Sequence, residues 1–197
     1  MTTVVELEKT EVSVLARKKF CTDEIYKMME IGILPEESGW ELINGEIIHR
    51  MSIGNKHAGT VNKLTQLLVI LLGREVVVAV QNPIHIDDFN EPEPDIALLK
   101  PREDFYTESH PLPADILLLI EVSNSTLEYD RKIKKTLYAE AEILEFWLIN
   151  LTENTIECHS SPKNGSYRLV KIVGIGETVE SGLIESLTLT VDEILGL

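Results

Sequence analysis

The spacing of apolar and polar residues predicts a chain in which short strands are interleaved with a few amphipathic helices. The clearest strand signal is residues 40–51, WELINGEIIHRM, where strand-forming residues flank an Asn-Gly pair at positions 44–45. Asn-Gly favours a two-residue hairpin turn, because both turn positions require positive φ. The resulting register pairs Glu41 with Ile48 and places Glu41 on the same face as Ile43. A carboxylate on such a face is paired, lies at an edge or acts as a ligand, because burying it unpaired is costly.

Two helices are predicted in the first half of the chain. Residues 20–34 form a packing helix with Thr22 as its N-cap and Gly32 near its end. Residues 52–73 form a longer helix that Gly73 ends. Its inward stripe consists of Val61, Leu64, Leu68 and Leu71. His57 lies one turn before this stripe, so we expect it to face inward at the head of the helix, where anions are also favoured.

The remaining apolar runs predict the strands of a sheet. Residues 76–80 are rich in valine, and residues 96–99 form a short buried strand that begins at Asp95. Residues 116–122 are continuously apolar and are the best candidate for the centre of the sheet, since a strand covered on both faces has no polar alternation. Residues 144–150 give a further strand. Residues 155–162 pair with residues 167–173 through a turn at 163–165, and the tail is expected to form short strands and a terminal apolar turn.

A third helix is predicted between the strands at 116–122 and 144–150. Residues 125–128 have the form of a capping box, although Asp130 could cap a slightly later start. The expected inward stripe is Ile133, Leu137, Ala141 and Leu144. Lys134 and Tyr138 lie beside this stripe, so we expect them at the boundary of the core, within reach of the end of the sheet.

Composition limits the class of protein. A chain of 197 residues that is 44% hydrophobic can bury one substantial core. We expect a lead segment at 1–17, with an edge strand at 12–15, followed by a single domain at 18–197. The N-terminus has no secretory signal pattern, and the apolar runs are too short to cross a bilayer. Two cysteines without metal-ligand spacing fit a reducing compartment, so a soluble cytoplasmic protein is expected.

Candidate chemistry gathers between residues 94 and 134. Asp95 and Glu121 each stand at the end of an apolar run, and the basic segment DRKIKK follows. Two isolated acids at strand ends and a nearby lysine cluster are typical of metal-assisted phosphodiester cleavage. The same pattern also arises from ordinary loop acids and a solvated helix face, so the spacing alone leaves both interpretations open.

The overall charge points the other way. Asp and Glu outnumber Lys and Arg by 33 to 18, which gives a formal net charge of −15. Proteins that bind nucleic acid usually carry a basic patch, because neutralising phosphates supplies much of their affinity. The basic residues beside the candidate acids and any bound divalent cation would offset part of this acidity locally.

Several separated blocks, in order, carry a resemblance to a known family. The blocks are the hairpin WELINGEIIHRMS, VQNPIHI with EPEPDIALLK, LLLIEVSNSTLEYDRKIKKTLYAEAEILEFWLIN and the closing GETVESGLIESLTLTVDEIL. Over about residues 18–195 the chain resembles the Uma family of endonucleases, a branch of the PD-(D/E)XK nuclease superfamily. The resemblance implies an α/β, restriction-endonuclease-like fold, with a mixed central β-sheet flanked by helices and with additional β-hairpins.

The resemblance also implies a divalent-metal site. Asp95 matches the family's PD aspartate and Glu121 the acid of its (D/E)XK element. The superfamily pattern places a lysine two residues after this acid, where this chain has Ser123. In Uma-like sequences the lysine lies on the next helix, at the position of Lys134. A long side chain from a neighbouring helix can bring its ammonium to the same place.

We therefore expect a metal-dependent endonuclease that hydrolyses phosphodiester bonds in DNA. Mg²⁺ or Mn²⁺ would be held by Asp95, Glu121 and the backbone carbonyl of Val122, with Glu41 as a third candidate acid. Lys134 would orient the attacking water or neutralise the transition state, and His57 would be an accessory group. The expected DNA contacts are Arg131, Lys132 and Lys135.

Two alternatives remain open at this stage. One is a catalytically silent nuclease fold that acts as a binding or regulatory module, with a homodimer as one form of it. The other is an enzyme for a small phosphorylated substrate, although the sequence has no glycine loop that would cradle a phosphate. If Lys134 serves catalysis alone, Lys134→Ala should abolish cleavage and leave folding and metal affinity nearly intact.

Overall fold

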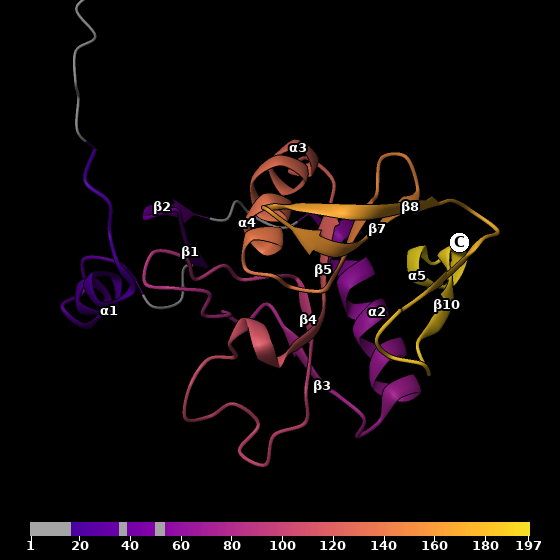
Figure 1. Cartoon of the computed structure of the whole chain (residues 1–197), viewed down its shortest axis with the longest axis horizontal. Coiled ribbons are helices and arrows are strands. Elements are labelled where there is room, and N and C mark those ends of the chain that lie inside the picture. The colour runs from indigo at the N-terminus through magenta and orange to yellow at the C-terminus, as the bar shows by residue number, and fades with distance from the viewer. Residues whose placement is uncertain (1–16, 36–38, 50–53) are drawn as a thin grey trace, which may run out of the picture.

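A computed structural model describes residues 17–35, 39–49 and 54–197. Its centre is a six-stranded sheet in the order β3-β4-β5-β6-β7-β8 (Figure 1). The strands are β3 Val77–Val80, β4 Ile96–Leu99, β5 Ile116–Ser123, β6 Glu145–Asn150, β7 Thr155–Lys163 and β8 Ser166–Val173. Neighbouring strands are antiparallel except for β5 and β6, which are parallel. The mixed central sheet predicted from the sequence is thus confirmed, whereas the strand expected at residues 12–15 lies outside the described residues.

β5 lies in the middle of the sheet, as its unbroken apolar run predicts. A parallel pair needs a crossover connection, and here a helical segment supplies it. This segment consists of α3 Leu127–Tyr129, the π-helical η2 Asp130–Lys134 and α4 Lys135–Glu140. A short 3₁₀ turn, η1 Pro113–Asp115, precedes β5.

One face of the sheet is covered by α2 Asn55–Leu72 and by the tail, which forms β9 Thr178–Glu180, β10 Thr188–Thr190 and α5 Val191–Leu195 (Figure 1). Leu64 and Leu68 of α2 are fully buried, and Gly73 ends the helix as expected. Leu71, however, is 41% exposed, and Leu72 is buried in its place. At about 100° per residue, Leu72 lies about 40° from Leu68 and Leu71 about 60° away on the far side of the stripe. The helix therefore buries the fourth residue after Leu68, not the third.

The other face is covered by α4 and by the hairpin of β1 Trp40–Ile43 and β2 Glu46–His49. The predicted hairpin register is confirmed, since Glu41 pairs with Ile48 across the Asn-Gly turn. The opposite side of the hairpin packs on α1 Thr22–Glu30 in a separate small core. Thr22 is the first residue of α1 and not its N-cap, which is Cys21. The backbone N–H of Thr22 donates to the carbonyl of Asp88, which ties α1 to the loop before β4.

The helical crossover differs most from the sequence prediction. Thr126 precedes the first helical residue and makes no side-chain cap, so the expected capping box is absent. Ile133 is 38% exposed and Leu144 is 53% exposed, while Lys134 and Tyr138 are buried. A π turn contains an extra residue, so helix faces before and after it do not follow one 3.6-residue period. Leu144 lies beyond the helix, which ends at Glu140. Among the helices described, none has the length and apolar character that crossing a membrane would require.

Candidate active site

The sheet register brings the two predicted acids together. β4 and β5 are antiparallel with Ile96 opposite Ile120, so the preceding residue Asp95 lies opposite Glu121. Both side chains are almost fully buried, with 2% of Asp95 and 3% of Glu121 exposed. Buried carboxylates need partners, and each of these has several.

Asp95 is held at both of its oxygens. Its Oδ2 accepts a hydrogen bond from the backbone N–H of Val122 at 2.9 Å and lies 2.9 Å from Nε2 of His57. Its Oδ1 accepts from the side-chain amide of Gln81 at 3.3 Å. His57 thus faces inward at the head of α2, as predicted, and it contacts the candidate metal ligand directly. Its Nδ1 is buried and has no hydrogen-bond partner among the described residues.

Lys134 joins Glu121 to the hairpin. Its Nζ donates to Oε1 of Glu121 at 3.0 Å and to Oε1 of Glu41 at 2.8 Å, and only 4% of the residue is exposed. The hydroxyl of Tyr138 donates to the same oxygen of Glu121 at 2.6 Å. Glu41 also accepts the backbone N–H of Glu93 at 2.9 Å, which fixes the hairpin against the loop before β4. The lysine expected from the resemblance therefore lies beside the acids, although it is distant from them in sequence.

The electrostatics of this cluster are dominated by burial. Burial raises the pKa of Glu121 to about 8; the Lys134 ammonium opposes this rise, while Asp95, Asp130 and Glu41 add to it. Burial alone would lower the pKa of Lys134, but the carboxylates of Glu121 and Glu41 outweigh it and raise the pKa. Lys134 is therefore a permanent positive charge, whereas Glu121 exchanges its proton near neutral pH.

The π-helical segment explains why a lysine faces the core. η2 ends at Lys134, and both Asp130 and Lys134 are buried on the side of the helix that faces β5. Asp130 accepts a hydrogen bond from the hydroxyl of Ser123 at 2.6 Å. Ser123 occupies the position where the superfamily pattern has its lysine, so it anchors the helix that carries the lysine instead. π turns are frequent at functional sites because they redirect side chains in this way.

Sequence analysis placed Tyr138 within reach of the end of the sheet without giving it a role, and it did not single out Tyr129. Tyr138 lies four residues after Lys134, a spacing that places both on one helical face and could have indicated its role. Tyr129 has a buried hydroxyl without a hydrogen-bond partner among the described residues. Burial raises the pKa of Tyr129 to about 12, and the neighbouring carboxylate of Glu41 contributes to the rise. No sequence pattern marked this residue.

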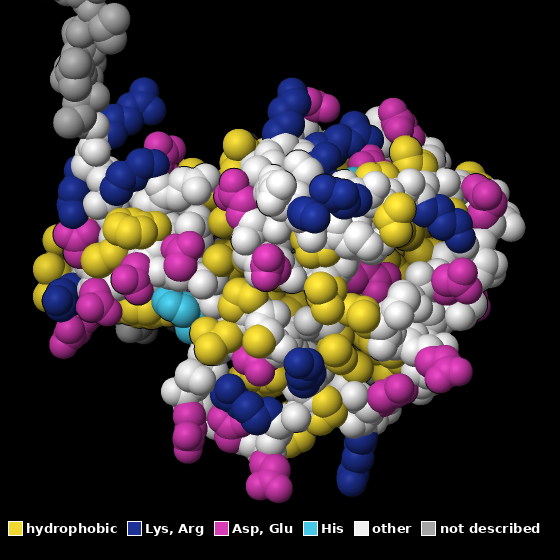
Figure 2. Space-filling model, viewed as in Figure 1, with side chains coloured by type: hydrophobic (Ala, Val, Ile, Leu, Met, Phe, Trp, Pro, Cys, Tyr) yellow, Lys and Arg dark blue, Asp and Glu magenta, His cyan; other side chains and the backbone are white. Residues whose placement is uncertain are grey.

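The predicted DNA contacts lie outside the buried cluster. In Figure 2, Lys and Arg side chains lie around α3 and β8, near α1 and at the lower edge, and Asp and Glu are scattered among them across the same face. Arg131 donates to Oε1 of Glu157 at 2.7 Å through its Nε, and Lys132 is exposed and pairs with Glu128 at 2.7 Å. Burial alone would raise the pKa of Glu157, but hydrogen bonds from His159 and Arg131 lower it to about 2. Arg131 is therefore already engaged within the fold.

The donor set is compatible with a hard divalent cation. Asp95 and Glu121 supply carboxylate oxygens from adjacent strands, which Mg²⁺ and Mn²⁺ prefer. Within residues 17–35, 39–49 and 54–197, no group of three or more His, Cys, Asp or Glu side chains is arranged to hold a metal ion. Mg²⁺ usually needs only one or two carboxylates and keeps several waters, so a pair of acids is sufficient.

Comparisons with known proteins agree with this fold. A family model described as "Uma2: Putative restriction endonuclease" matches residues 23–192. Among solved structures, the chain is similar to a crystal structure described as a "putative nuclease belonging to DUF820" from Anabaena variabilis. The TM-score is 0.69 at 18% identity, over 90% of this chain and 98% of that one. No curated protein matches the chain. The family model spans most of the sequence and confirms the resemblance to the Uma endonucleases, so the chain belongs to the Uma2 family.

Proposed function

We propose that the protein is a metal-dependent endonuclease that hydrolyses phosphodiester bonds in DNA. The observation that carries the proposal is the position of Lys134, whose ammonium lies 3.0 Å from Glu121 and 2.8 Å from Glu41, in the same buried cluster as Asp95. Burying charged groups is costly, and clusters of buried ionisable groups are typical of functional sites. Family membership and the nuclease fold support the same activity.

Each residue of the cluster has a distinct task in this proposal. Asp95, Glu121 and the carbonyl of Val122 would hold Mg²⁺ or Mn²⁺, with Glu41 as a further acid. When bound, the ion supplies a Lewis acid and lowers the pKa of a water. Glu121 must release its proton to act as a ligand, which its pKa of about 8 makes accessible near neutral pH.

Lys134 and His57 act beside the ligands. Lys134 remains protonated, so it stabilises negative charge that develops on the phosphate and does not serve as a base. His57 contacts Oδ2 of Asp95 and leaves Oδ1 to Gln81, so it orients this carboxylate. Both contributions come from groups that are already in place before the substrate binds.

One observation favours the silent binding module. Arg131 forms an ion pair with Glu157, and Lys132 forms an exposed ion pair with Glu128, so two of the three expected DNA contacts already pair with acids of the same chain. A module that binds a protein partner, alone or as a homodimer, would not need free basic residues there.

Cleavage of supercoiled plasmid and of single-stranded circular DNA tests the proposal. The parent should cut with Mg²⁺ or Mn²⁺ and not in EDTA. Asp95→Asn and Glu121→Gln should each lower the rate by at least about 100-fold, since each removes a carboxylate charge at the reaction centre. Lys132→Ala is the matched control, because its exposed side chain lies outside the cluster and its loss should weaken DNA binding only. If Asp95→Asn or Glu121→Gln cuts DNA as fast as the parent, the assignment of that acid to the active site is refuted.

A further inference from the structure

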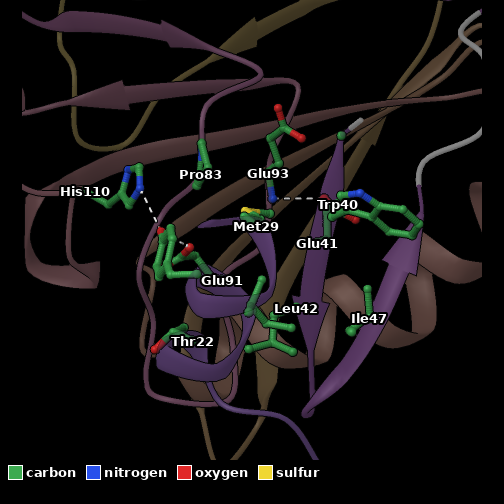
Figure 3. Close-up of a pocket in the computed structure, with 13 residues that line it drawn as sticks. Thr22, Met29, Trp40, Glu41, Leu42, Ile47, Pro83, Glu91, Glu93 and His110 are labelled. Atoms are coloured by element: carbon green, nitrogen blue, oxygen red, sulfur yellow. Dashed lines mark hydrogen bonds between the residues drawn. The ribbon is translucent and has the colours of Figure 1, made fainter. Parts of the chain in front are cut away.

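A cavity beside the candidate active site has no role in the proposed cleavage. It has a volume of about 230 Å³ and lies between α1, the β1–β2 hairpin and the loops before β4 and η1 (Figure 3). Glu41 lines the cavity and also accepts the hydrogen bond from Lys134, so a single side chain separates the cavity from the acid cluster. A ligand in the cavity would therefore lie next to the position where a phosphate meets Lys134.

The walls of the cavity suit a flat, mainly apolar ring. Trp40 and Tyr26 contribute aromatic groups, Met29 a polarisable thioether, and Leu42 and Ile47 apolar surface. Pockets of this composition, with a few polar groups that fix orientation, are typical of small aromatic ligands. Stacking of nucleobases on aromatic side chains is a common mode of binding single strands.

The polar groups restrict which ring fits. Three glutamates line the cavity, and in Figure 3 the carboxylate of Glu93 points away from the other lining side chains, which leaves those of Glu41 and Glu91 to repel phosphate and accept hydrogen bonds. Glu91 is fixed in place, since the Tyr26 hydroxyl donates to its Oε1 at 2.5 Å and Nδ1 of His85 lies 3.1 Å from its Oε2. Nε1 of Trp40 is a buried donor without a partner among the described residues.

We propose that this cavity receives one nucleobase of the substrate strand and selects bases that carry an exocyclic amine. Adenine, cytosine and guanine each present an amino donor, which matches the glutamate carboxylates, and the Trp40 ring supplies a surface on which the base can stack. Thymine has no amino group, and the two carbonyl oxygens that flank its ring N–H repel an approaching carboxylate. The inference rests on the proposed nuclease function, because it makes the cavity the base-reading part of the same site. A base that enters it leaves its stack, as in other enzymes that extrude a base.

Binding of short labelled strands tests this inference without cleavage. Fluorescence anisotropy in Ca²⁺ buffer compares an all-thymidine strand with strands that carry one central cytidine, adenosine or guanosine. A strand with one amino-bearing base should bind about tenfold more tightly, the effect of one hydrogen bond to a charged group. Glu91→Gln, which removes an acceptor charge, and Trp40→Leu, which removes the stacking surface, should each bring the ratio towards one, with thermal melts to confirm folding. Tyr106→Phe, in the exposed loop near Arg102, is the matched control and should keep the ratio.

The outcomes separate the cavity from the nuclease activity. Equal affinity for all four strands, or no binding of any strand, overturns the base pocket. If the same preparation nevertheless cuts plasmid, the proposed nuclease activity is supported and only the base pocket is rejected. If base selectivity is present and depends on Trp40 and Glu91 but no DNA is cut, the base pocket is supported and the proposed nuclease activity is rejected.

Discussion

Replacing Lys134 by methionine tests how much its ammonium stabilises the buried carboxyl groups of the cluster. Methionine has a similar length and fits an apolar surrounding, so the change removes the charge without leaving a large cavity. It leaves the carboxyls of Glu41 and Glu121 buried, each 3% exposed, without the ammonium that lies 2.8 and 3.0 Å from them. Breaking a buried ion pair by removing one partner typically costs about 3–5 kcal/mol of the free energy of unfolding.

This cost should depend on pH. Burial raises the pKa of Glu121 from its ordinary 4.5 to about 8 in the folded protein. A carboxyl whose pKa is raised by folding takes up a proton more readily when folded, so its stability contribution is present at low pH and is lost as pH rises from 4.5 towards 8. Without Lys134 the pKa of Glu121 rises further, so the loss is larger. We expect the Lys134→Met penalty to be about 1 kcal/mol larger near pH 9 than near pH 5, because parent and variant differ in the proton on Glu121 only above about pH 8 and one pH unit corresponds to about 1.4 kcal/mol.

Urea unfolding of parent and variant in EDTA, at the acidic and the alkaline pH, measures the difference. Lys132→Met is the control, since Lys132 forms only an exposed pair with Glu128 and should change stability by less than about 1 kcal/mol at either pH. A Lys134→Met penalty that is the same at both pH values would refute the idea that an uncompensated Glu121 causes it. The burial of Lys134 also revises the expectation from the sequence that Lys134→Ala leaves folding nearly intact.

Two further predictions concern ligands. In calorimetric titrations, Asp95→Asn and Glu121→Gln should each abolish Mn²⁺ binding, and unchanged binding in both variants would rule out the metal site. The Mn²⁺ affinity of the parent should rise about tenfold per pH unit up to about pH 8, because Glu121 releases its proton on binding. DNA binding should be weak, should fall with salt and should strengthen with Ca²⁺, and Lys132→Ala should reduce the salt slope by about one. Binding that ignores both salt and Ca²⁺ would favour the protein-binding module.

The positions of Asp95 and Glu121 could be predicted because local patterns determine them. Asp95 begins one apolar run and Glu121 ends another, and short strands that are adjacent along the chain tend to pair. The hairpin register was equally predictable, since the Asn-Gly turn determines which residues face Glu41. What the pattern could not give is where the hairpin docks. That depends on the bond from Glu93 N–H to Glu41 and on the bridge between Leu42 and Glu91, which join segments far apart in sequence.

The sequence predicts that a helix carries Lys134, but it does not predict which side of this helix faces the core. A 3.6-residue period assigned Ile133 and Leu144 to the core, but Ile133 lies in the π turn, which breaks that period, and Leu144 lies beyond the end of the helix. Hydrophobic patterns also assume that buried faces are apolar. Here the buried side of the helix holds Asp130 and Lys134, which are stable there because they pair with groups on the sheet and on the hairpin. Functional clusters break the apolar rule in this way, so they are where pattern-based assignment is least accurate.

The acidity of the chain argues less strongly against DNA binding than its net charge of −15 implies. That figure counts every acid as ionised, but burial raises the pKa of Glu121 to about 8, which reduces the charge of this residue near neutral pH. The lysine missing from its usual sequence position is present in space at Lys134. Both reasons for a silent fold are therefore weakened, while the internal pairing of Arg131 still limits the basic surface. A nuclease with these properties would depend on its divalent ion for DNA affinity as well as for chemistry, because the ion adds positive charge where the substrate phosphate must lie.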